Sequence, residues 1–581
     1  MLSSLIDRVG EWNPQLFREL KGRLKMRPVA IIVGLSGLGQ VLLYLFYQGL
    51  LPTQNSYDHR YCLGAPPPDW YGYQNGYTSI PNNFCQKDAA GNLLASTINS
   101  QLWWLDLFVC MSIIGIFALL VVGVYMLISD LSREERRGTL GFIRLSPQST
   151  ASILTGKILG VPVLLYLFGL LALPLHLAAG LVAGIPLHLI LSFYVVLAAS
   201  CAFFYSGALV YGLVSSGLGN FQAWFASGAV LFFVSVMTAI VISPDATAGN
   251  AVDWLIQLYP GITLPYLVDA TGISQEVVNY LSVKNLAELQ FFGLNLWSNS
   301  VTGIGFTCLN YLFWSYWFWQ GLQRRFHDSH KTLLSKLQSY LVTASLTLIL
   351  LGFTLQKPSW GDYPQGMFEH FVVLFSFGFV LFLGAIALLS PHRQTLYDWA
   401  RFRHQNPSHR RNLMKDLLWG EKSPATLAIA VNLAISCAII VPCLVLLPLK
   451  EYKIPFLFGL LLTASITLLY AAIAQSLLLM KTRKRALWAA GTVSAAMILP
   501  LICFAVFRID PNLNPGVWLF SFVPVVATQY AQTTTVLLAI LGEWTAILLV
   551  NFQMTKQLQK AGESETKALL SSRSNAAAAI G

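Results

Sequence analysis

Residues Leu107–Ser129 read LFVCMSIIGIFALLVVGVYMLIS and contain no Asp, Glu, Lys or Arg. A helix needs about 20 apolar residues to cross the ~30 Å hydrocarbon core of a bilayer. Backbone polar groups in lipid must be satisfied within the structure itself, and this stretch is too long for a strand of a membrane barrel. The stretch therefore predicts a transmembrane helix.

Eleven more stretches of comparable length show the same pattern. They cover residues 29–51, 158–182, 187–214, 221–243, 300–322, 337–355, 371–390, 425–449, 454–480, 486–507 and, interrupted only by Glu543, 533–553. Of the 581 residues only 11% are charged, against about 25% in soluble domains. The expected fold class is all-α, a polytopic integral membrane protein of about twelve transmembrane helices surrounded by membrane lipid.

The basic residues predict the orientation of these helices. If the N-terminus is cytoplasmic, thirty of the 37 Lys and Arg residues lie in cytoplasmic segments and seven lie on the opposite side. Lys and Arg are retained on the cytoplasmic side during insertion. We therefore expect both termini in the cytoplasm and the chain in the plasma (inner) membrane. The net charge of +11 is spread over short loops, which argues against a nucleic-acid partner.

Two outer segments, residues 52–106 and 244–299, are long. The first contains Cys62 and Cys85, whereas the other six cysteines lie within membrane stretches. Two cysteines alone in one extracytoplasmic segment suggest a disulfide bond. Two unpaired thiols are the alternative.

The sequence shows no catalytic pattern. The Walker A motif, G-x-x-x-x-G-K-[ST], does not occur. The histidines stand in basic loops or beside prolines, without a cluster of cysteines or carboxylates, and no nucleophile is paired with a base. We therefore expect no enzyme activity in this chain, and neither a metal site nor a bound cofactor.

The N-terminal residues 13–25 read NPQLFRELKGRLK and predict an amphipathic helix. Asn13 can cap this helix and Pro14 suits its first position. Four apolar residues fall on one face, with basic residues on the other, so the helix can lie in the headgroup plane. These four are Leu16, Phe17, Leu20 and Leu24. A basic flank that only fixes the orientation is a simpler interpretation, compatible with the first.

The cytoplasmic link between the second and third stretches, residues 130–157, predicts two short helices. It contains SREERRGTLGFIRLSP at residues 132–147, with apolar residues at helical spacing. Ser146-Pro147 should break the first helix, and Ser149 or Thr150 can cap the second. A helix–break–helix of this kind, parallel to the membrane, is a rigid body that a cytoplasmic partner can push.

This link resembles the signature of ABC transporter permeases of the second exporter family (ABC type 2 permeases). The matching elements are an acidic–basic run, Gly-Thr-Leu, an apolar pair, a Ser-Pro break and a Gly-Lys pair. Here they are Glu134–Arg137, Gly138-Thr139-Leu140, Phe142-Ile143, Ser146-Pro147 and Gly156-Lys157. The Asn13-Pro14 helix resembles the family's amphipathic elbow, so the resemblance covers about residues 13–326. Gly141 departs from the family, in which an acidic residue is usual.

The resemblance implies a function. In this family the cytoplasmic segments contact a separate ATP-binding-cassette ATPase subunit and transmit its closure to the membrane helices. It implies a transport permease, expected to be an exporter, in a homo- or hetero-oligomer whose ATP hydrolysis takes place in another subunit. The residues implied in coupling are Arg133, Glu134, Glu135, Arg136, Arg137, Gly138, Thr139 and Leu140. An ion-coupled transporter and a membrane scaffold without transport activity are the alternatives.

The order of the stretches predicts two six-helix units. The expected divisions are a cytoplasmic elbow segment (1–27), a first permease unit (28–326), a second, degenerate unit (327–560) and a cytoplasmic tail (561–581). The Gly-Thr-Leu motif does not recur in the second unit. Residues 412–424 read like a second elbow, which would favour an arrangement of eight and four helices over six and six.

Glu543 lies at the middle of its membrane stretch. An ionised carboxylate there costs several kcal/mol unless it faces protein or water. One interpretation is a cavity or helix-pairing residue near Asn310, Asn432 or Gln475. The other is a tilted or shifted helix that leaves Glu543 protonated or at a shallow depth.

Overall fold

The computed structural model describes residues 10–65, 83–88, 92–94, 97–215, 219, 221–243, 249–328, 331–358, 363–405, 413–449, 451–482 and 484–578. Over these residues the chain is helical and forms only isolated β-bridges in place of strands. The all-α class is confirmed. The predicted end segments 1–27 and 561–581 lie partly outside the described residues.

Among the described residues, eleven helices are long and apolar enough to cross a membrane. They are α3 (Met26–Gly49), the continuous helix formed by α5 (Ser100–Phe117), η2 (Ala118–Val122) and α6 (Gly123–Arg136), α9 (Val163–Val182), α10 (Leu187–Val214), α11 (Phe221–Ile242), α17 (Lys336–Thr354), α18 (Tyr363–Leu389), α21 (Thr426–Leu446), α22 (Lys453–Leu478), α23 (Arg485–Val506) and α26 (Thr533–Ala578). They correspond to eleven of the twelve predicted stretches and agree with a multi-pass membrane protein.

The twelfth predicted stretch, 300–322, forms α16 (Ser300–His327) but is not among the eleven. Its 28 residues are long enough to cross a bilayer. Trp, Tyr, Asn and Gln side chains replace much of its aliphatic content, and their polar groups make the helix less apolar than the others. The structure therefore supports the length of this helix but not the apolar character that the stretch suggested.

The chain divides into two compact units. Unit 1 comprises Met1–Thr247, Leu255–Leu289 and Asn295–Trp319, and unit 2 comprises Ala248–Trp254, Gln290–Leu294 and Gln320–Gly581. Unit 1 contains five of the eleven helices and most of α16, and unit 2 contains the other six. The long helices are thus grouped six and six, although two short pieces of the outer segment 244–299 belong to unit 2.

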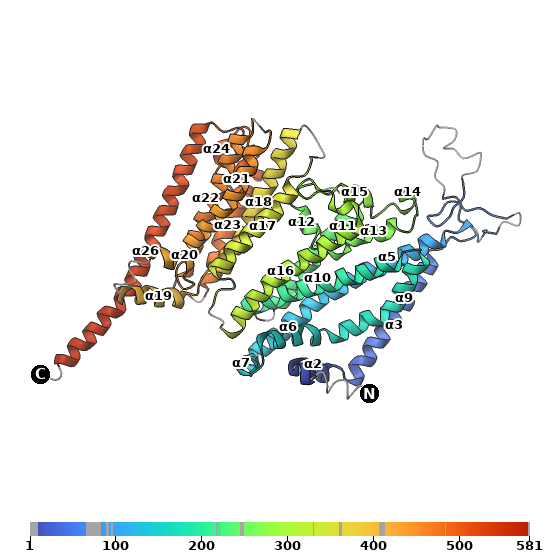
Figure 1. Cartoon of the computed structure of the whole chain (residues 1–581), viewed down its shortest axis with the longest axis horizontal. Helices are drawn as coiled ribbons and strands as arrows, with labels where there is room; N and C mark the ends of the chain where they lie inside the picture. Colours follow the sequence, from blue (N-terminus) through green and yellow to red (C-terminus); the bar gives the residue numbers. More distant parts are fainter. Residues whose placement is uncertain are drawn as a thin grey trace. The chain divides into compact units, whose positions relative to one another are not determined.

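In unit 1 the third predicted stretch is divided. The short helix α8 (Thr150–Gly160) ends before Pro162, and α9 begins at Val163. α3 and α5 both pack against α9, while α6 packs against α10 and α11. The helices α2 (Pro14–Arg23) and α7 (Thr139–Leu145) lie at one end of the unit, and the short α14 (Gln275–Val278) lies at the other end (Figure 1).

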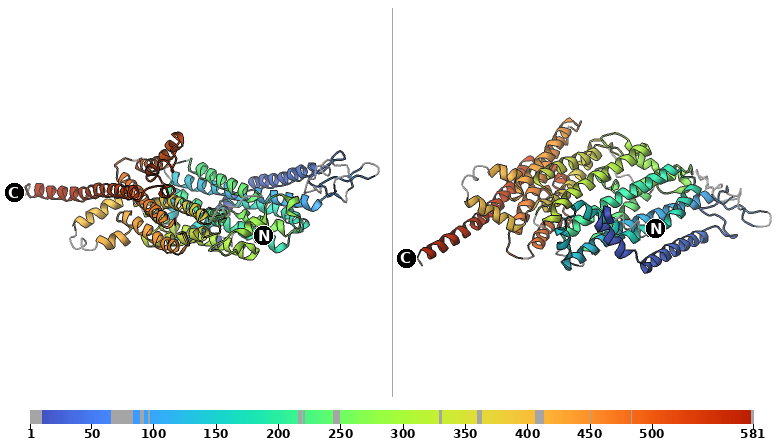
Figure 2. Two further views of the ribbon diagram at one scale, coloured as in Figure 1. Left: turned by 90° about the horizontal axis from the view of Figure 1, so that it is seen from above. Right: turned by 60° about the horizontal axis from the view of Figure 1, so that its bottom comes forward.

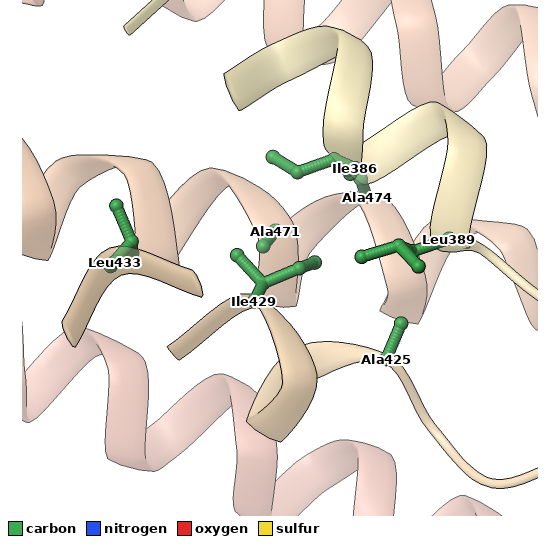
Figure 3. Close-up of a cluster of buried hydrophobic side chains, with 7 residues drawn as sticks. All are labelled: Ile386, Leu389, Ala425, Ile429, Leu433, Ala471 and Ala474. Atoms are coloured by element: carbon green, nitrogen blue, oxygen red, sulfur yellow. The ribbon is translucent and has the colours of Figure 1, made fainter. Parts of the chain in front are cut away.

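In unit 2 the core lies where α18, α21 and α22 meet. Ile386 and Leu389 of α18 pack against Ala425, Ile429 and Leu433 at the start of α21 and against Ala471 and Ala474 of α22 (Figure 3). The alanines on α22 leave room for the larger side chains of the other two helices. α26 packs against α22 and α19 (Arg393–Gln405) and is continuous in both views of Figure 2.

The link 391–424 contains α19 and the seven-residue helix α20 (Leu413–Trp419). Asn412, which would begin a second elbow, lies outside the described residues. The buried Lys336 Nζ atom donates to the carbonyl oxygens of Leu417 and Pro424. This contact fastens the end of α20 to α17, both within unit 2.

Candidate functional site

The amphipathic helix α2 begins as predicted. The Asn13 side-chain oxygen accepts a hydrogen bond from the Leu16 N–H at 2.9 Å, and Pro14 occupies the first turn. Of the four apolar residues only Leu16 is buried, together with the polar Gln15 and Glu19. α2 therefore turns a polar face towards the rest of unit 1. The placement of the apolar face in the headgroup plane stays a prediction.

The predicted helix–break–helix is also confirmed. Gly138, at φ +70°, turns the chain from α6 into α7, a conformation that glycine adopts without steric cost. α7 ends at Leu145, and Ser149 caps α8 by accepting a hydrogen bond from the Ser152 N–H at 3.2 Å. α6, α7 and α8 thus form one continuous link with a turn before α7 and a second turn before α8.

α2 packs against α8 at very close range. The Asn13 side-chain nitrogen donates to the Ser152 carbonyl oxygen at 2.8 Å. A Cβ atom added at Gly156 would lie 2.8 Å from Asn13 Oδ1, and one added at Gly160 would lie 2.5 Å from the Cβ atom of Glu19. The two glycines, one helical turn apart, allow the backbones to approach this closely.

Lys157, which follows Gly156, is buried with its side chain 1% exposed. Its Nζ atom lies 2.9 Å from Asp130 Oδ2 and 2.6 Å from Glu134 Oε2. Asp130 and Glu134 are four residues apart on α6, so both carboxylates project from the same face of that helix. A buried charge requires partners of this kind, because an isolated ammonium group would be strongly destabilising there.

The same two carboxylates also bind α2. Arg18 Nη2 lies 2.6 Å from Glu134 Oε1, and Arg23 Nη2 lies 2.6 Å from Asp130 Oδ1. Glu19 contacts both arginines, at 3.2 Å and 3.1 Å. We refer to this group of three acids and three bases as the ion network, which consists of Arg18, Glu19, Arg23, Asp130, Glu134 and Lys157. It joins α2, α6 and α8.

The three carboxylates of the ion network lie within 4.8 Å of one another, a spacing that could suit a metal ion. The three basic side chains already contact these carboxylates at 2.6 to 3.2 Å and balance their charge. Burial lowers the pKa of the Arg18 guanidinium, but Glu134 and Glu19 outweigh this, so that its pKa lies above the ordinary value. We therefore interpret the cluster as a structural ion-pair network.

The eight residues predicted for coupling are divided by the structure. Glu134 belongs to the ion network and Leu140 is buried. The other six are exposed: Arg133, Glu135, Arg136, Arg137, Gly138 and Thr139. Thr139 Oγ1 donates to the Glu134 carbonyl oxygen at 3.2 Å and holds the turn between α6 and α7. The predicted segment thus has one side that packs against the protein and one side that is exposed.

α7 continues the accessible side with two apolar residues. Leu140 and Ile143 face the protein and are buried, whereas Phe142 and Leu145 are 78% and 85% exposed. The exposed pair is three residues apart and therefore shares one face of the helix. A contiguous exposed apolar face beside basic side chains is typical of an interaction surface.

A disulfide and the Asp106 carboxylate fix described residues of the predicted outer segment 52–106. Cys62 and Cys85 are joined by a disulfide bond, the pairing that the sequence predicted. Arg60 contacts the Asp106 carboxylate at 2.9 Å and 3.1 Å, and the Tyr280 hydroxyl donates to it at 2.5 Å. Asp106 thus connects the two long outer segments of unit 1.

Glu543 is buried in α26 with 2% of its surface exposed. Among the described residues, neither of its carboxylate oxygens has a hydrogen-bond partner. The three amides predicted as possible partners bond elsewhere: Asn310 to Trp314, Asn432 to Ser339, and Gln475 to Ala425. Within unit 2, Glu543 therefore makes no hydrogen bond to Asn432 or Gln475, and its depth in a membrane stays a prediction.

Sequence reasoning missed the acidic partners of Lys157 and the polar face of α2. Asp130 stands four residues before Glu134, and Glu19 four residues before Arg23. Spacing of this kind on a helix places both members on one face, but it does not indicate that Lys157 lies opposite them. Comparison of the chain with protein-family models, with curated proteins and with solved structures gives no match, and the site is therefore interpreted from its own geometry.

Proposed function

We propose that the chain is the membrane-spanning permease subunit of an ATP-driven transporter of the ABC type. It acts as an exporter, and a separate cytoplasmic ATPase subunit hydrolyses the ATP. In this proposal α16 is the twelfth crossing, and both termini and the ion network lie in the cytoplasm. The disulfide of the outer segment lies on the opposite side of the plasma (inner) membrane.

The observation that carries the proposal is the attachment of α7 at both of its ends. α6, which carries Glu134, leads into α7 through the turn Arg137-Gly138, and residues 146–149 join α7 to α8, which carries Lys157. Glu134 and Lys157 contact each other at 2.6 Å. A partner that displaces α7 would therefore move α6, α8 and, through Arg18, α2 as one body. A solvated loop would not need a buried ion network at its base.

The outer side of the segment indicates the chemistry of the partner. Arg133, Arg136 and Arg137 are exposed, and so are Phe142 and Leu145 a few residues further along the chain. A complementary surface would offer an apolar groove with an acidic rim, because charge complementarity orients the encounter while buried apolar anchors supply most of the affinity. We assign this groove to the ATPase subunit.

The test is purification of the tagged full-length chain from its own cell membranes, with measurement of ATP hydrolysis in the complex. We expect a subunit with a Walker A motif to co-purify and to hydrolyse ATP. The double variant Phe142→Asp, Leu145→Asp should reduce its recovery about tenfold or more, since central interface anchors contribute 2 kcal/mol or more each. Leu513→Asp is the matched control, because Leu513 is 81% exposed and lies outside unit 1.

Recovery of the chain without an ATPase, or equal recovery of the ATPase with both variants, would contradict the proposal. A scaffold that binds an ATPase without transport would keep the interaction but show no substrate-dependent change in ATP hydrolysis. An ion-coupled transporter is the candidate that Glu543 favours, since such transporters rely on ionisable residues in the membrane. It predicts that transport depends on an ion gradient and persists without ATP.

A further inference from the structure

Unit 1 contains a cavity of about 690 Å³ between α3, α5 with η2, α9 and α10. Ligand pockets usually measure about 300–1,000 Å³. At its rim Leu42, Phe46 and Leu170 are 56%, 61% and 63% exposed. All three belong to helices long and apolar enough to cross a membrane, so the cavity opens sideways towards lipid.

The wall of the cavity carries no ionisable acid or base other than histidine and tyrosine. No Asp, Glu, Lys or Arg is among the described residues that line it. Its polar lining residues are Ser36, Gln40, Ser112, Tyr166, His176 and Tyr194. A charged ligand would lose its hydration without gaining a counter-ion here, which is strongly unfavourable. The occupant should therefore be uncharged.

His176 lies at the centre of the polar part of the wall. Its Nε2 atom lies 2.8 Å from Ser112 Oγ, and its Nδ1 atom lies 2.7 Å from the Tyr194 hydroxyl oxygen. The imidazole packs against the rings of Phe108 and Phe193, with centroids 4.2 Å and 5.9 Å away. The ring is thus fixed in orientation, with both nitrogens bonded.

The direction of these hydrogen bonds follows from Ser112. Its hydroxyl donates to the Phe108 carbonyl oxygen at 2.8 Å, so Ser112 Oγ must accept from His176 Nε2. A neutral imidazole donates from one nitrogen and accepts at the other. Nδ1 therefore accepts from the Tyr194 hydroxyl. In this arrangement Ser112, His176 and Tyr194 all donate their hydrogens to protein atoms. A ligand therefore finds only lone pairs, on the hydroxyl oxygens of Tyr194 and Ser112.

The other polar side chains of the wall also donate their hydrogens to protein carbonyl oxygens. The Gln40 amide nitrogen donates to the carbonyl oxygens of Ser36 and Leu171, both at 3.2 Å. The Ser36 hydroxyl donates to the Phe168 carbonyl oxygen, and the Tyr166 hydroxyl donates to that of Ile158. The cavity thus offers hydrogen-bond acceptors and no free donor among these groups.

The helix beside the cavity is irregular. η2 interrupts the α5–α6 helix, and its residues Ala118 and Leu119 line the cavity. The Leu119 carbonyl oxygen accepts a hydrogen bond from the buried Tyr205 hydroxyl at 2.7 Å. Single π-helical turns occur frequently at functional sites, and here the turn shapes one wall of the cavity.

We propose that this cavity binds an uncharged lipid alcohol, an amphiphile with one hydroxyl group and a long-chain or polycyclic apolar body. The apolar body lies between α3, α5 and α9. Its hydroxyl group donates to the free lone pair of the Tyr194 oxygen or of Ser112 Oγ. This site is independent of the proposed ATP-driven transport, since it requires only that unit 1 stands in a membrane.

The test uses the full-length protein in phosphatidylcholine vesicles and three photoactivatable probes of equal chain length. These are a diazirine-bearing hexadecanol, its methyl ether and the corresponding hexadecanoate. We expect saturable labelling of peptides from α5, α9 and α10 by the alcohol. Labelling by the ether should be roughly two- to tenfold weaker, since it lacks the donor for one hydrogen bond. The carboxylate should label these peptides weakest.

Two variants test whether the labelling depends on the cavity and on the hydrogen bond between His176 and the Tyr194 hydroxyl. Gly169→Leu fills the cavity, because Gly169 lines it and has nothing within 4 Å of an added Cβ atom. It should abolish labelling by the alcohol, whereas Gly228→Leu on α11, equally free of neighbours, should not. His176→Phe keeps the aromatic packing but releases the Tyr194 hydroxyl as a donor. It should make labelling by the alcohol and by the ether nearly equal.

Equal labelling of the wild-type protein by alcohol and ether would overturn the proposal, and so would preferential labelling by the carboxylate. Undiminished labelling of Gly169→Leu would do the same, provided that the variant elutes as the wild-type protein does in size-exclusion chromatography. The comparison of the three probes on the wild-type protein needs no variant. Because no ATPase is involved, a negative result leaves the proposed transport function untouched.

Discussion

The Lys157 Nζ atom lies 2.6 Å from Glu134 Oε2, although α7 and its two turns separate these residues in the chain. The Lys157 side chain is 1% exposed and that of Glu134 is 13% exposed. The contact closes a loop whose outermost part is the exposed face of α7. The contact thus joins the two ends of the segment between α6 and α8, while Phe142 and Leu145 of α7 stay exposed.

Replacement of Lys157 by Met should destabilise the protein. It leaves Asp130 and Glu134 with Arg23 and Arg18 as their remaining partners among the described residues, so the cost should stay below the ~3–5 kcal/mol of a buried charge left without any partner. We expect a clear fall in the apparent Tm of the purified protein in detergent, measured by intrinsic fluorescence. Lys21→Met is the control, because Lys21 is exposed on α2, and should change the apparent Tm little.

A double-mutant cycle separates the contribution of the Lys157–Glu134 ion pair to stability from the effect of the changed side-chain volume. Lys157→Met combined with Glu134→Gln should be less destabilised than the sum of the two single variants, because residues in one ion network couple by about 0.5–3 kcal/mol. Additive changes in apparent Tm would show that Lys157 and Glu134 do not interact, and the attachment of α7 would have to be abandoned.

Substitution of Gly160 by Val should detach α2 from α8. An added Cβ atom would lie 2.5 Å from that of Glu19, a distance that the backbone of α2 can relieve only by moving away. Limited trypsin digestion of sealed inside-out vesicles should then cleave at Arg18 and Arg23 faster than in the wild-type protein. Gly141→Val is the control, since nothing lies within 4 Å there. Equal cleavage in both variants would speak against the packing of α2 on α8.

Local features of this site could be read from the sequence, whereas its long-range contacts could not. The caps at Asn13 and Ser149 and the break at Ser146-Pro147 act on backbone groups within a few residues. Asp130, in contrast, finds Lys157 and Arg23 at separations of 27 and 107 residues. No periodicity reports such a pairing, because it depends on how α2 and α8 pack.

The same distinction explains the differences in the fold. The long helices follow directly from charge-free stretches, since lipid leaves the backbone no other way to satisfy its hydrogen bonds. For α2 the apolar residues predicted a face in the headgroup plane and left open which side packs against the protein. α8 presents glycines and Lys157 there, and the polar Gln15 and Glu19 of α2 are buried. For Glu543 the stretch 533–553 alone does not distinguish a cavity or helix-pairing residue from a protonated or shallow one.

The stability of unit 2 should depend on pH through Asp253 in the outer segment. Burial raises the pKa of this carboxyl to about 7, against hydrogen bonds from Gln356 and Asn250 that lower it. The unfolded chain ionises near the ordinary value of about 4. Between these pH values the folded state holds one proton more, so the free energy of unfolding falls by about 1.4 kcal/mol per unit as pH rises.

Asp253→Asn should therefore flatten the difference in apparent Tm between pH 5 and pH 7. Both hydrogen bonds go to the Oδ2 atom of Asp253, so the amide oxygen of Asn can replace it as acceptor. Asp269→Asn, at an exposed site, should keep the pH dependence of the wild-type protein. A wild-type Tm that rises between pH 5 and pH 7, together with no effect of Asp253→Asn, would refute the assignment.

Glu543 offers the sharpest distinction between a structural and a functional role. Its carboxylate is buried without a hydrogen-bond partner among the described residues, and an unsatisfied buried polar group costs about 1–3 kcal/mol. Glu543→Met should therefore raise the apparent Tm, whereas Glu369→Met, at an exposed position of α18, should not. If the stabilised Glu543→Met protein also loses transport while Glu543→Gln retains part of it, the polar group serves function at the expense of stability. Unchanged stability and unchanged transport in both variants would contradict both the stability cost of the buried carboxylate and a functional role for it.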